Sequence, residues 1–226
     1  MMVLQELTHI SARQSPDSAL GSGCSTSNNN SGDAITDDSR ATANSNSTDE
    51  VPKYGCAGLL FASYLGHLTS VMNLVERDSK LISTRDPRGR SALHLAAWRG
   101  HYQCVEYLIE KGIDIEAVDD SGATALMYAV RDPVSVHIVE FLLNHGADIA
   151  KRDYHNNTVL HHSCLSKNEE AGKVLTVHLA KNDPDRELCN AVNDCGETAL
   201  HIALRNGLIE FMLTFVPFGS KSMWIQ

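Results

Sequence analysis

One stretch decides the fold of this chain: Asp86-Pro-Arg-Gly-Arg-Ser-Ala-Leu-His-Leu-Ala-Ala-Trp-Arg-Gly-His101. It returns with small changes at residues 119–129, 153–162 and 193–203. Its central leucine, Leu93, recurs as Leu126, Leu160 and Leu200, at intervals of 33, 34 and 40 residues. A period in this range is typical of solenoids, whose units bury their apolar faces only against neighbouring units. We therefore expect an all-α repeat solenoid.

Each unit is expected to hold two short helices and a hairpin. A hydroxyl residue precedes the repeated core, where it can cap the free N–H groups of a first helix. Gly100 suits the left-handed conformation that ends this helix, and the apolar residues of 105–109 show the spacing of a second. Residues 119–122 have the chemistry of a tight turn. The capping residues are Ser91, Thr124, Thr158 and Thr198.

Two units depart from this pattern. Asp132-Pro133 replaces the Gly-His of residues 100–101, which predicts an N-cap followed by proline at the first helical position. Residues 181–187 lengthen the link after the second helix of the fourth unit and explain the interval of 40. Both changes are predicted to fall in loops, where insertions cost little.

The repeated phrase resembles the ankyrin repeat, whose signature is Thr-Pro-Leu-His-x-Ala in a unit of roughly 33 residues. The resemblance covers residues 52–216, with units near 52–85, 86–118, 119–152, 153–192 and 193–216; the first is either a worn repeat or an end cap. It implies about five helix-turn-helix units joined by β-hairpin loops. It also implies that His94, His161 and His201 bond to the backbone and join neighbouring units. Asn190 stands where members of this family often carry an Asn that asparaginyl hydroxylases modify.

A second resemblance concerns the C-terminal half of the chain. Residues 157–164, the loop 182–189 and residues 197–208 are similar to the end of the long ankyrin-repeat regulatory subunits of serine/threonine protein phosphatase 6. Those subunits carry many more repeats, so this resemblance implies a fragment, a short isoform or a shortened relative. It also implies a regulatory or targeting role in a phosphatase complex.

The ends of the chain differ from the repeats. Residues 1–51 are rich in Ser, Asn and Thr and poor in apolar residues, which predicts a disordered tail, and 217–226 is expected to be a C-terminal tail. The chain begins without the basic residues and long apolar core of a secretory signal. No segment approaches the roughly 18 apolar residues of a membrane helix, so no membrane insertion is expected.

Charge and cysteine usage bound the compartment and the partners. The net charge is −9 with no basic run, which argues against nucleic acid as the ligand. The six cysteines are scattered, and this favours reduced thiols in an intracellular protein. We expect a cytoplasmic or nuclear location.

Catalytic and metal-binding chemistry finds little support. His161-His162-x-Cys164, with His178 and Cys189 downstream, suggests zinc, but the spacing is not that of a known finger and no Cys-x-x-Cys pair exists. The chain also lacks a Gly-x-Ser-x-Gly elbow and a phosphate-binding loop. We expect neither an enzyme nor a protein that needs a metal or cofactor.

A partner protein is expected to bind the concave surface formed by hairpin tips and first helices. Trp, Tyr and Arg are enriched at binding hot spots, and several are predicted to face this surface. The candidate partner-binding residues are Tyr54, Tyr64, Arg88, Arg90, Trp98, Arg99, Arg131, Tyr154 and Arg205. They suit an acidic or aromatic-bearing protein segment. The alternative is that Trp98 packs on its neighbouring helix and the arginines are only solvated.

The C-terminal unit conflicts with the rest of the pattern. Residues 211–218 are strongly apolar and the last unit has no polar cap, although a solenoid needs polar end repeats for solubility. A further repeat would cover this end, as would residues 223–225 if they fold back. Two functions therefore stay open: a binding scaffold, or a fragment of a larger repeat protein without a partner of its own.

Overall fold

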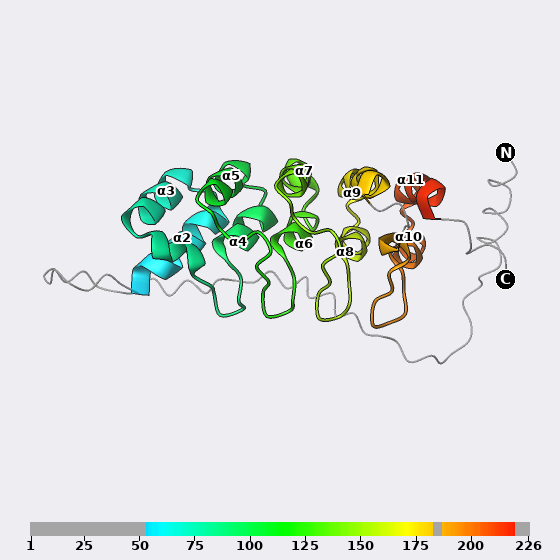
Figure 1. The fold of residues 1–226 in the computed structure, drawn as a ribbon, viewed down its shortest axis with the longest axis horizontal. Helices are drawn as coiled ribbons and strands as arrows, with labels where there is room; N and C mark the ends of the chain where they lie inside the picture. The colour runs from blue at the N-terminus through cyan, green and yellow to red at the C-terminus, as the bar shows by residue number, and fades with distance from the viewer. Residues whose placement is uncertain (1–52, 183–186, 220–226) are drawn as a thin grey trace, which may run out of the picture. The chain divides into compact units, whose positions relative to one another are not determined.

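The computed structural model describes residues 53–182 and 187–219. Ten α-helices alternate along this part of the chain between an inner and an outer row (Figure 1). The inner row is α2 (Lys53–Leu65), α4 (Ala92–Trp98), α6 (Ala125–Ala129), α8 (Val159–Leu165) and α10 (Ala199–Asn206). The outer row is α3 (Leu68–Arg77), α5 (Tyr102–Glu110), α7 (Val136–Asn144), α9 (Glu169–Asn182) and α11 (Ile209–Gly219). Three short 3₁₀ turns join them: η1 (Ser79–Ser83), η2 (Pro133–Ser135) and η3 (Leu188–Asn190).

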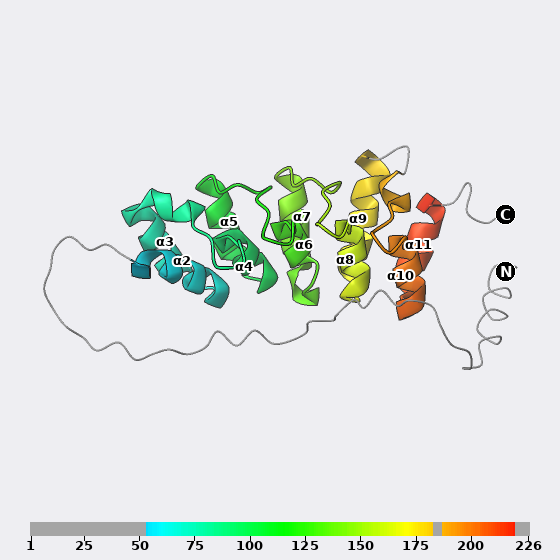
Figure 2. The same cartoon turned by 90° about the horizontal axis from the view of Figure 1, so that it is seen from below.

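The two rows run side by side, and each inner helix packs against the inner helices before and after it (Figure 2). Small residues make this approach possible: Ala92, Ala96 and Ala97 of α4 are fully buried. Larger residues, among them Leu93 and Leu108, fill the space between the rows. The core is therefore continuous from unit to unit, as the period of the sequence predicts.

Between the helix pairs, long loops project away from the rows (Figure 1). Each loop closes through one isolated antiparallel bridge, such as Arg85 with Ser91. Successive loops are joined by backbone bonds: the N–H of Asp120 donates to the carbonyl of Arg88, and that of Tyr154 donates to Ser121. The described residues thus form hairpin-like loops with single bridges, without extended strands.

The caps of the inner helices follow the expectation at some positions and not at others. The hydroxyls of Ser91 and Thr198 accept the N–H of the histidine three residues later. At Thr158 the hydroxyl bonds to the His161 ring. Thr124 makes no side-chain cap bond, so that prediction is wrong there. The reason is local, because Met127 stands where the other units carry a histidine whose ring orients the hydroxyl.

The histidines of the repeated core join neighbouring units, as expected for two of three. The ring of His94 accepts at Nδ1 from the Ser91 backbone, and its Nε2–H donates to the carbonyl of Ala123 in the next unit at 3.1 Å. His161 does the same with Thr158 and with the carbonyl of Glu197. Within the described ranges, the ring of His201 makes only the local bonds to Thr198.

The two irregular units differ in how they match the prediction. Asp132 caps η2 through the N–H of Val134, with Pro133 at the first helical position, as expected. The extra residues of the fourth unit do not all lie in a loop, however. α9 has 14 residues where α5 and α7 have nine each, and it includes Lys181 and Asn182. Part of the insertion therefore lengthens a helix, because those residues continue its hydrogen-bonded turns.

Several predictions concern residues outside or at the edge of the described part. The tail expected at 1–51 lies outside it, as do residues 220–226 of the tail expected at 217–226; the start of that tail is wrong, because α11 continues to Gly219. Cys104, Cys164 and Cys189 are buried and not disulfide-bonded, and burial raises the pKa of Cys164 to about 12. Cys195 is disulfide-bonded, so the expectation of reduced thiols throughout is wrong at this exposed hairpin position.

Candidate functional site

The hairpin loops are organised by a carboxylate or amide at their first position. In each loop the side-chain oxygen accepts the backbone N–H groups of the residues two and four positions later. The residues concerned are Asp86, Asp119, Asp153 and Asn193. This arrangement holds every loop in the same conformation, so the side chains at its tip project from a rigid base.

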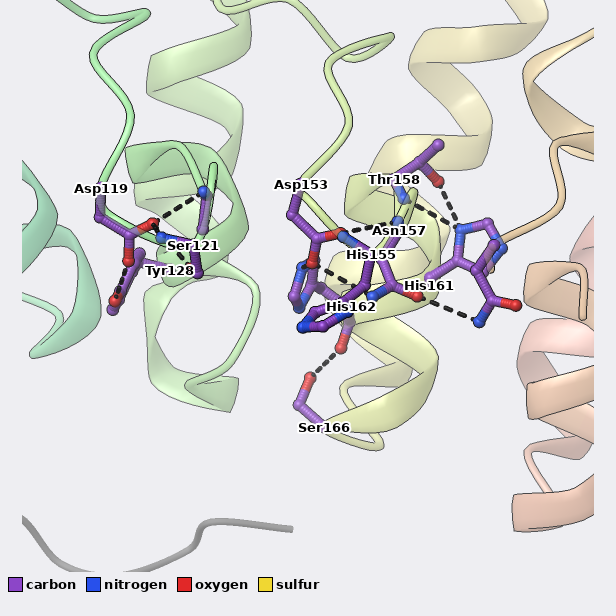
Figure 3. A network of polar contacts seen from close by, with 12 residues as sticks. Asp119, Ser121, Tyr128, Asp153, His155, Asn157, Thr158, His161, His162 and Ser166 are labelled. Carbon is purple, nitrogen blue, oxygen red and sulfur yellow. Dashed lines mark hydrogen bonds and ion pairs between the residues drawn. The ribbon is translucent and has the colours of Figure 1, made fainter. Parts of the chain in front are cut away.

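Two of these carboxylates receive a second bond from the first helix of their own unit (Figure 3). The hydroxyl of Tyr128 donates to Asp119 at 2.7 Å, and Nε2 of His162 donates to Asp153 at 3.0 Å. Burial, followed by the bond to Asp119, raises the pKa of Tyr128 to about 12. Burial alone would raise the pKa of Asp153, but the bonds from His162 and Asn157 outweigh it and lower that pKa to about 2.

An aromatic ladder (Tyr64, Trp98 and Tyr128) crosses three consecutive inner helices. The rings of Tyr64 and Trp98 meet edge to face with centroids 6.0 Å apart, and Trp98 meets Tyr128 in the same manner at 6.1 Å. Edge-to-face pairs at such distances are favourable because the positive edge of one ring faces the negative face of the next. Tyr128 is buried, while Tyr64 and Trp98 are half-buried. The ladder therefore has one face in the core and one at the surface.

An arginine lies over each ring of the ladder. The guanidinium carbon of Arg99 is 4.9 Å from the centre of Tyr64, that of Arg90 is 5.5 Å from Trp98, and that of Arg131 is 4.5 Å from Tyr128. These are cation–π distances, and each contact restricts an otherwise long and flexible side chain. The surface formed by these six residues is called the arginine–aromatic ladder below.

The three arginines differ in how their charge is balanced. Arg90 is half-buried and bonds Asp86 through Nε at 2.7 Å, so its charge is neutralised. Arg99 and Arg131 are exposed and form no ion pair with any carboxylate of residues 53–182 and 187–219. The nearby carboxylates are already engaged, Asp119 by Tyr128 and Asp132 by the N–H of Val134. Two oriented positive charges thus flank a neutral centre.

The structure brings five of the nine predicted partner-binding residues together in this ladder: Tyr64, Arg90, Trp98, Arg99 and Arg131. Arg88 is exposed on the adjoining hairpin. Tyr154 is 69% exposed and its ring lies against Gly122 of the preceding loop. Arg205 pairs with Glu197 in its own unit. The side chain of Tyr54 lies outside the described residues.

Sequence reasoning missed Tyr128, which completes the ladder. Its position corresponds to Leu95 and Ile202, which are buried apolar residues in other units. A tyrosine at a position that carries leucine or isoleucine in two other units was the available signal, because its hydroxyl needs a buried partner. The two readings of Trp98 both hold in part: it packs on neighbouring rings and against the core, while its exposed face belongs to the ladder.

The described residues offer little to other kinds of ligand. In the described ranges no three His, Cys, Asp or Glu side chains gather as they would around a metal ion. His161, once a zinc candidate, uses its ring to join two units. A shallow hollow lies on the outer row between α5 and α7, lined by Tyr102, His137 and Phe141. Among the helices described here, none has both the length and the apolar character to cross a bilayer.

Comparison with protein families gives a consistent result. A model described as ankyrin repeats (3 copies) matches residues 33–119, 59–153 and 111–187. A second, described as ankyrin repeats (many copies), matches residues 169–216. A search of curated proteins found no match. Because these matches cover well over half of the chain and agree with its helix pairs and loops, the chain belongs to the ankyrin-repeat family.

Proposed function

We propose that this protein is a non-catalytic scaffold that binds a partner protein through the arginine–aromatic ladder on its inner helices. Ankyrin repeats are typically interaction domains, which supports the general role. The observation that carries the specific site is the pair of exposed, stacked guanidiniums of Arg99 and Arg131, which have no carboxylate partner in the described part of the chain. Such groups can donate hydrogen bonds to the carboxylates of an acidic partner.

The physical argument rests on preorganisation. A stacked guanidinium keeps its N–H edges free for a carboxylate, while the ring below limits the rotamers it explores. Ordering a freely moving long side chain on binding costs roughly 0.5–1.5 kcal/mol. A guanidinium already held over a ring loses less conformational entropy, so this cost is smaller for Arg99 and Arg131. The half-buried Trp98 adds apolar contact area between the two charges. Arginine and tryptophan are also the residues most often found at hot spots.

We further propose that the partner belongs to a serine/threonine phosphatase complex, in which this chain is a regulatory or targeting subunit. The support is the resemblance of residues 157–164, 182–189 and 197–208 to the phosphatase 6 regulatory ankyrin-repeat subunits. The ladder lies in units that precede this stretch. The binding site on the ladder and the membership of a phosphatase complex are therefore separate parts of this proposal.

Affinity capture from a cell lysate tests both parts, with the full chain as bait. The double variant Arg99→Ala/Arg131→Ala removes both unpaired charges and replaces only exposed side chains. Lys111→Ala is the matched control. The ammonium of Lys111 also lies over a ring, 5.2 Å from the centre of Tyr107, but this ring belongs to the outer helix α5. We expect a phosphatase catalytic or associated subunit that is lost in the double variant and retained in the control.

The other outcomes are equally informative. A partner retained by the double variant would place the interface elsewhere and contradict the ladder. A partner that is lost in the double variant but is unrelated to phosphatases would retain the ladder and reject the phosphatase role. Recovery of chaperones alone would reject both.

A second candidate function is that the repeats form part of a longer array. The observation that favours it is the apolar surface of the last helix pair, where Leu204, Ile209 and Leu213 are each more than half exposed. In a solenoid, a following unit buries such side chains. In this case the described repeats would contribute surface to a larger assembly without a partner of their own.

A further inference from the structure

We propose that the ladder recognises an extended acidic segment with two carboxylate side chains four positions apart and an apolar residue midway between them. The occupant is a segment of a partner protein, read by Arg99, Trp98 and Arg131. This inference rests on the proposed function and deepens it, because it states which chemistry the partner presents.

The ladder sets the spacing. Each tyrosine ring lies about 6 Å from the Trp98 ring, so the two tyrosine rings are at most twice that distance apart. Arg99 and Arg131 lie over these outer rings. In an extended peptide, side chains on one face recur every second residue with a rise of roughly 3.3 Å per residue. Residues four apart are then separated by roughly 13 Å, close to the upper limit that the ring distances set for the ladder, whereas residues two apart reach only about half of that limit.

The charge pattern sets the chemistry at each position. Arg99 and Arg131 are positive and unpaired within the described residues, which favours a carboxylate opposite each. Between them, Arg90 is neutralised by Asp86 and lies over Trp98. A third carboxylate there would face a neutral, partly apolar centre. The middle residue, two positions from each acid, is therefore expected to be apolar.

Binding of synthetic peptides to the full chain tests this arrangement, with fluorescence anisotropy as the readout. Peptides of one length and composition carry two Glu residues two, four or six positions apart, with Leu between them. We expect the peptide with a spacing of four to bind about fivefold or more tightly than the others, since a second charge-assisted pair forms only there. Replacement of both Glu by Gln should abolish the advantage.

Single variants assign the two ends. In Arg99→Gln or Arg131→Gln, the peptide with a spacing of four should fall to the affinity of the other two, because one pair is lost. Lys111→Ala should leave the order of affinities unchanged, since that charge lies on the outer row. Circular dichroism confirms that each variant retains its helices.

Three results would overturn the inference: equal affinity at all spacings, no measurable binding of any peptide, or an unchanged preference in both Gln variants. Failure here is distinct from failure of the proposed function. If cellular capture depends on Arg99 and Arg131 while the peptides show no spacing preference, the surface binds by charge alone. If capture is independent of these arginines, the ladder itself is not the interface.

Discussion

At the scale of single residues, the repeat position occupied by Tyr128 and His162 contributes to the core, and at Tyr128 it also contributes to the binding surface. Tyr128 and His162 stand where Leu95 and Ile202 fill the core of other units, yet each carries a polar group. Both are tolerated because the turn carboxylate of the same unit accepts their hydrogen bond. At Tyr128 this bond also orients a ring that Trp98 and Arg131 contact.

We predict that Tyr128→Phe lowers the free energy of unfolding by about 1–2 kcal/mol. The substitution keeps the ring but leaves Oδ2 of the buried Asp119 carboxylate without the Tyr128 hydroxyl, while Ser121 still bonds Oδ1. Urea unfolding followed by circular dichroism measures the change. Tyr107→Phe is the matched control, because the buried hydroxyl of Tyr107 has no hydrogen-bond partner among the described residues and its loss should be neutral or slightly stabilising. Equal losses in both variants would mean that the bond to Asp119 contributes nothing.

A pH dependence follows from three buried histidines. Burial lowers the pKa values of His94, His161 and His162 below their usual 6.5, although hydrogen bonds oppose the effect. A folded-state pKa below the unfolded value means that the unfolded chain binds more protons as the pH falls through 6.5. The free energy of unfolding should therefore decrease between about pH 7 and pH 5, with a limiting slope of about 1.4 kcal/mol per pH unit for each histidine.

Denaturant unfolding over this pH range checks the prediction. His162→Leu should reduce the slope, whereas His137→Gln, at an exposed position, should leave it unchanged. Asp153 adds a further loss in stronger acid, because its pKa is lowered from 3.8 to about 2 and its stabilisation disappears as the pH falls through that interval. A pH-independent stability from 7 to 5 would contradict the neutral state of the buried histidines.

At the scale of elements, the turn between the two helices of a unit links that unit to the preceding one. His101 donates through Nε2 to the carbonyl of Tyr64 at 2.9 Å. In the fourth unit Asn168 takes this place and donates to the carbonyls of Val130 and Asp132. Two different side chains thus make the same connection. The residue before each adopts a left-handed conformation, Gly100 in one unit and Lys167 in the other.

This comparison predicts that Lys167→Gly raises the free energy of unfolding by about 1 kcal/mol. Lys167 has a φ of 57°, a conformation that costs a residue with a Cβ about 1–2 kcal/mol, part of which glycine loses again through its flexible unfolded state. The reciprocal control is Gly100→Ala, which should lower stability because Gly100 has a φ of 74° and lies close to Ser135. Thermal unfolding of both variants checks the signs; a loss in Lys167→Gly would refute the strain.

At the scale of the whole repeat array, the last helix pair of the described stack exposes apolar side chains. Leu204, Ile209 and Leu213 of this pair are each more than half exposed, whereas the residues at the position of Leu204 in three internal units, Ala97, Val130 and Cys164, are fully buried. Phe211 on the other side of α11 is buried and lies against Gly172 of α9. α11 is therefore held firmly to its neighbour on one side and is apolar on the other.

We predict that Ile209→Lys/Leu213→Lys leaves the stability of the monomer within about 0.5 kcal/mol, since both side chains are exposed. We also expect the exposed apolar patch of Leu204, Ile209 and Leu213 to promote self-association of the chain, and the double variant to weaken it by removing most of that patch. Sedimentation velocity over a range of concentrations measures this effect. Val177→Lys, also at an exposed position but on α9, serves as the control for added charge. Unchanged association in the double variant would place the contact elsewhere.

The fold could be predicted from the sequence because its determinants are local and repeated. The hydroxyl caps at Ser91 and Thr198, the histidine bonds and the turn carboxylates each involve residues close together in the chain or at a fixed offset between units. Where a local partner is missing the prediction failed, as at Thr124, where Met127 replaces the histidine. The length of α9 was mispredicted because helix ends depend on packing as well as on sequence.

By itself, the sequence determined that this is an ankyrin-repeat stack with Trp, Tyr and Arg side chains near its inner surface. Only the tertiary structure decided which of them meet: Tyr64, Trp98 and Tyr128 come from three units and form one ladder. It also decided that Arg90 is neutralised by Asp86, while Arg99 and Arg131 are left unpaired in the described part of the chain. The physical reason is that a repeat period specifies backbone positions, whereas rotamers and charge pairing depend on every neighbour that packing brings into contact.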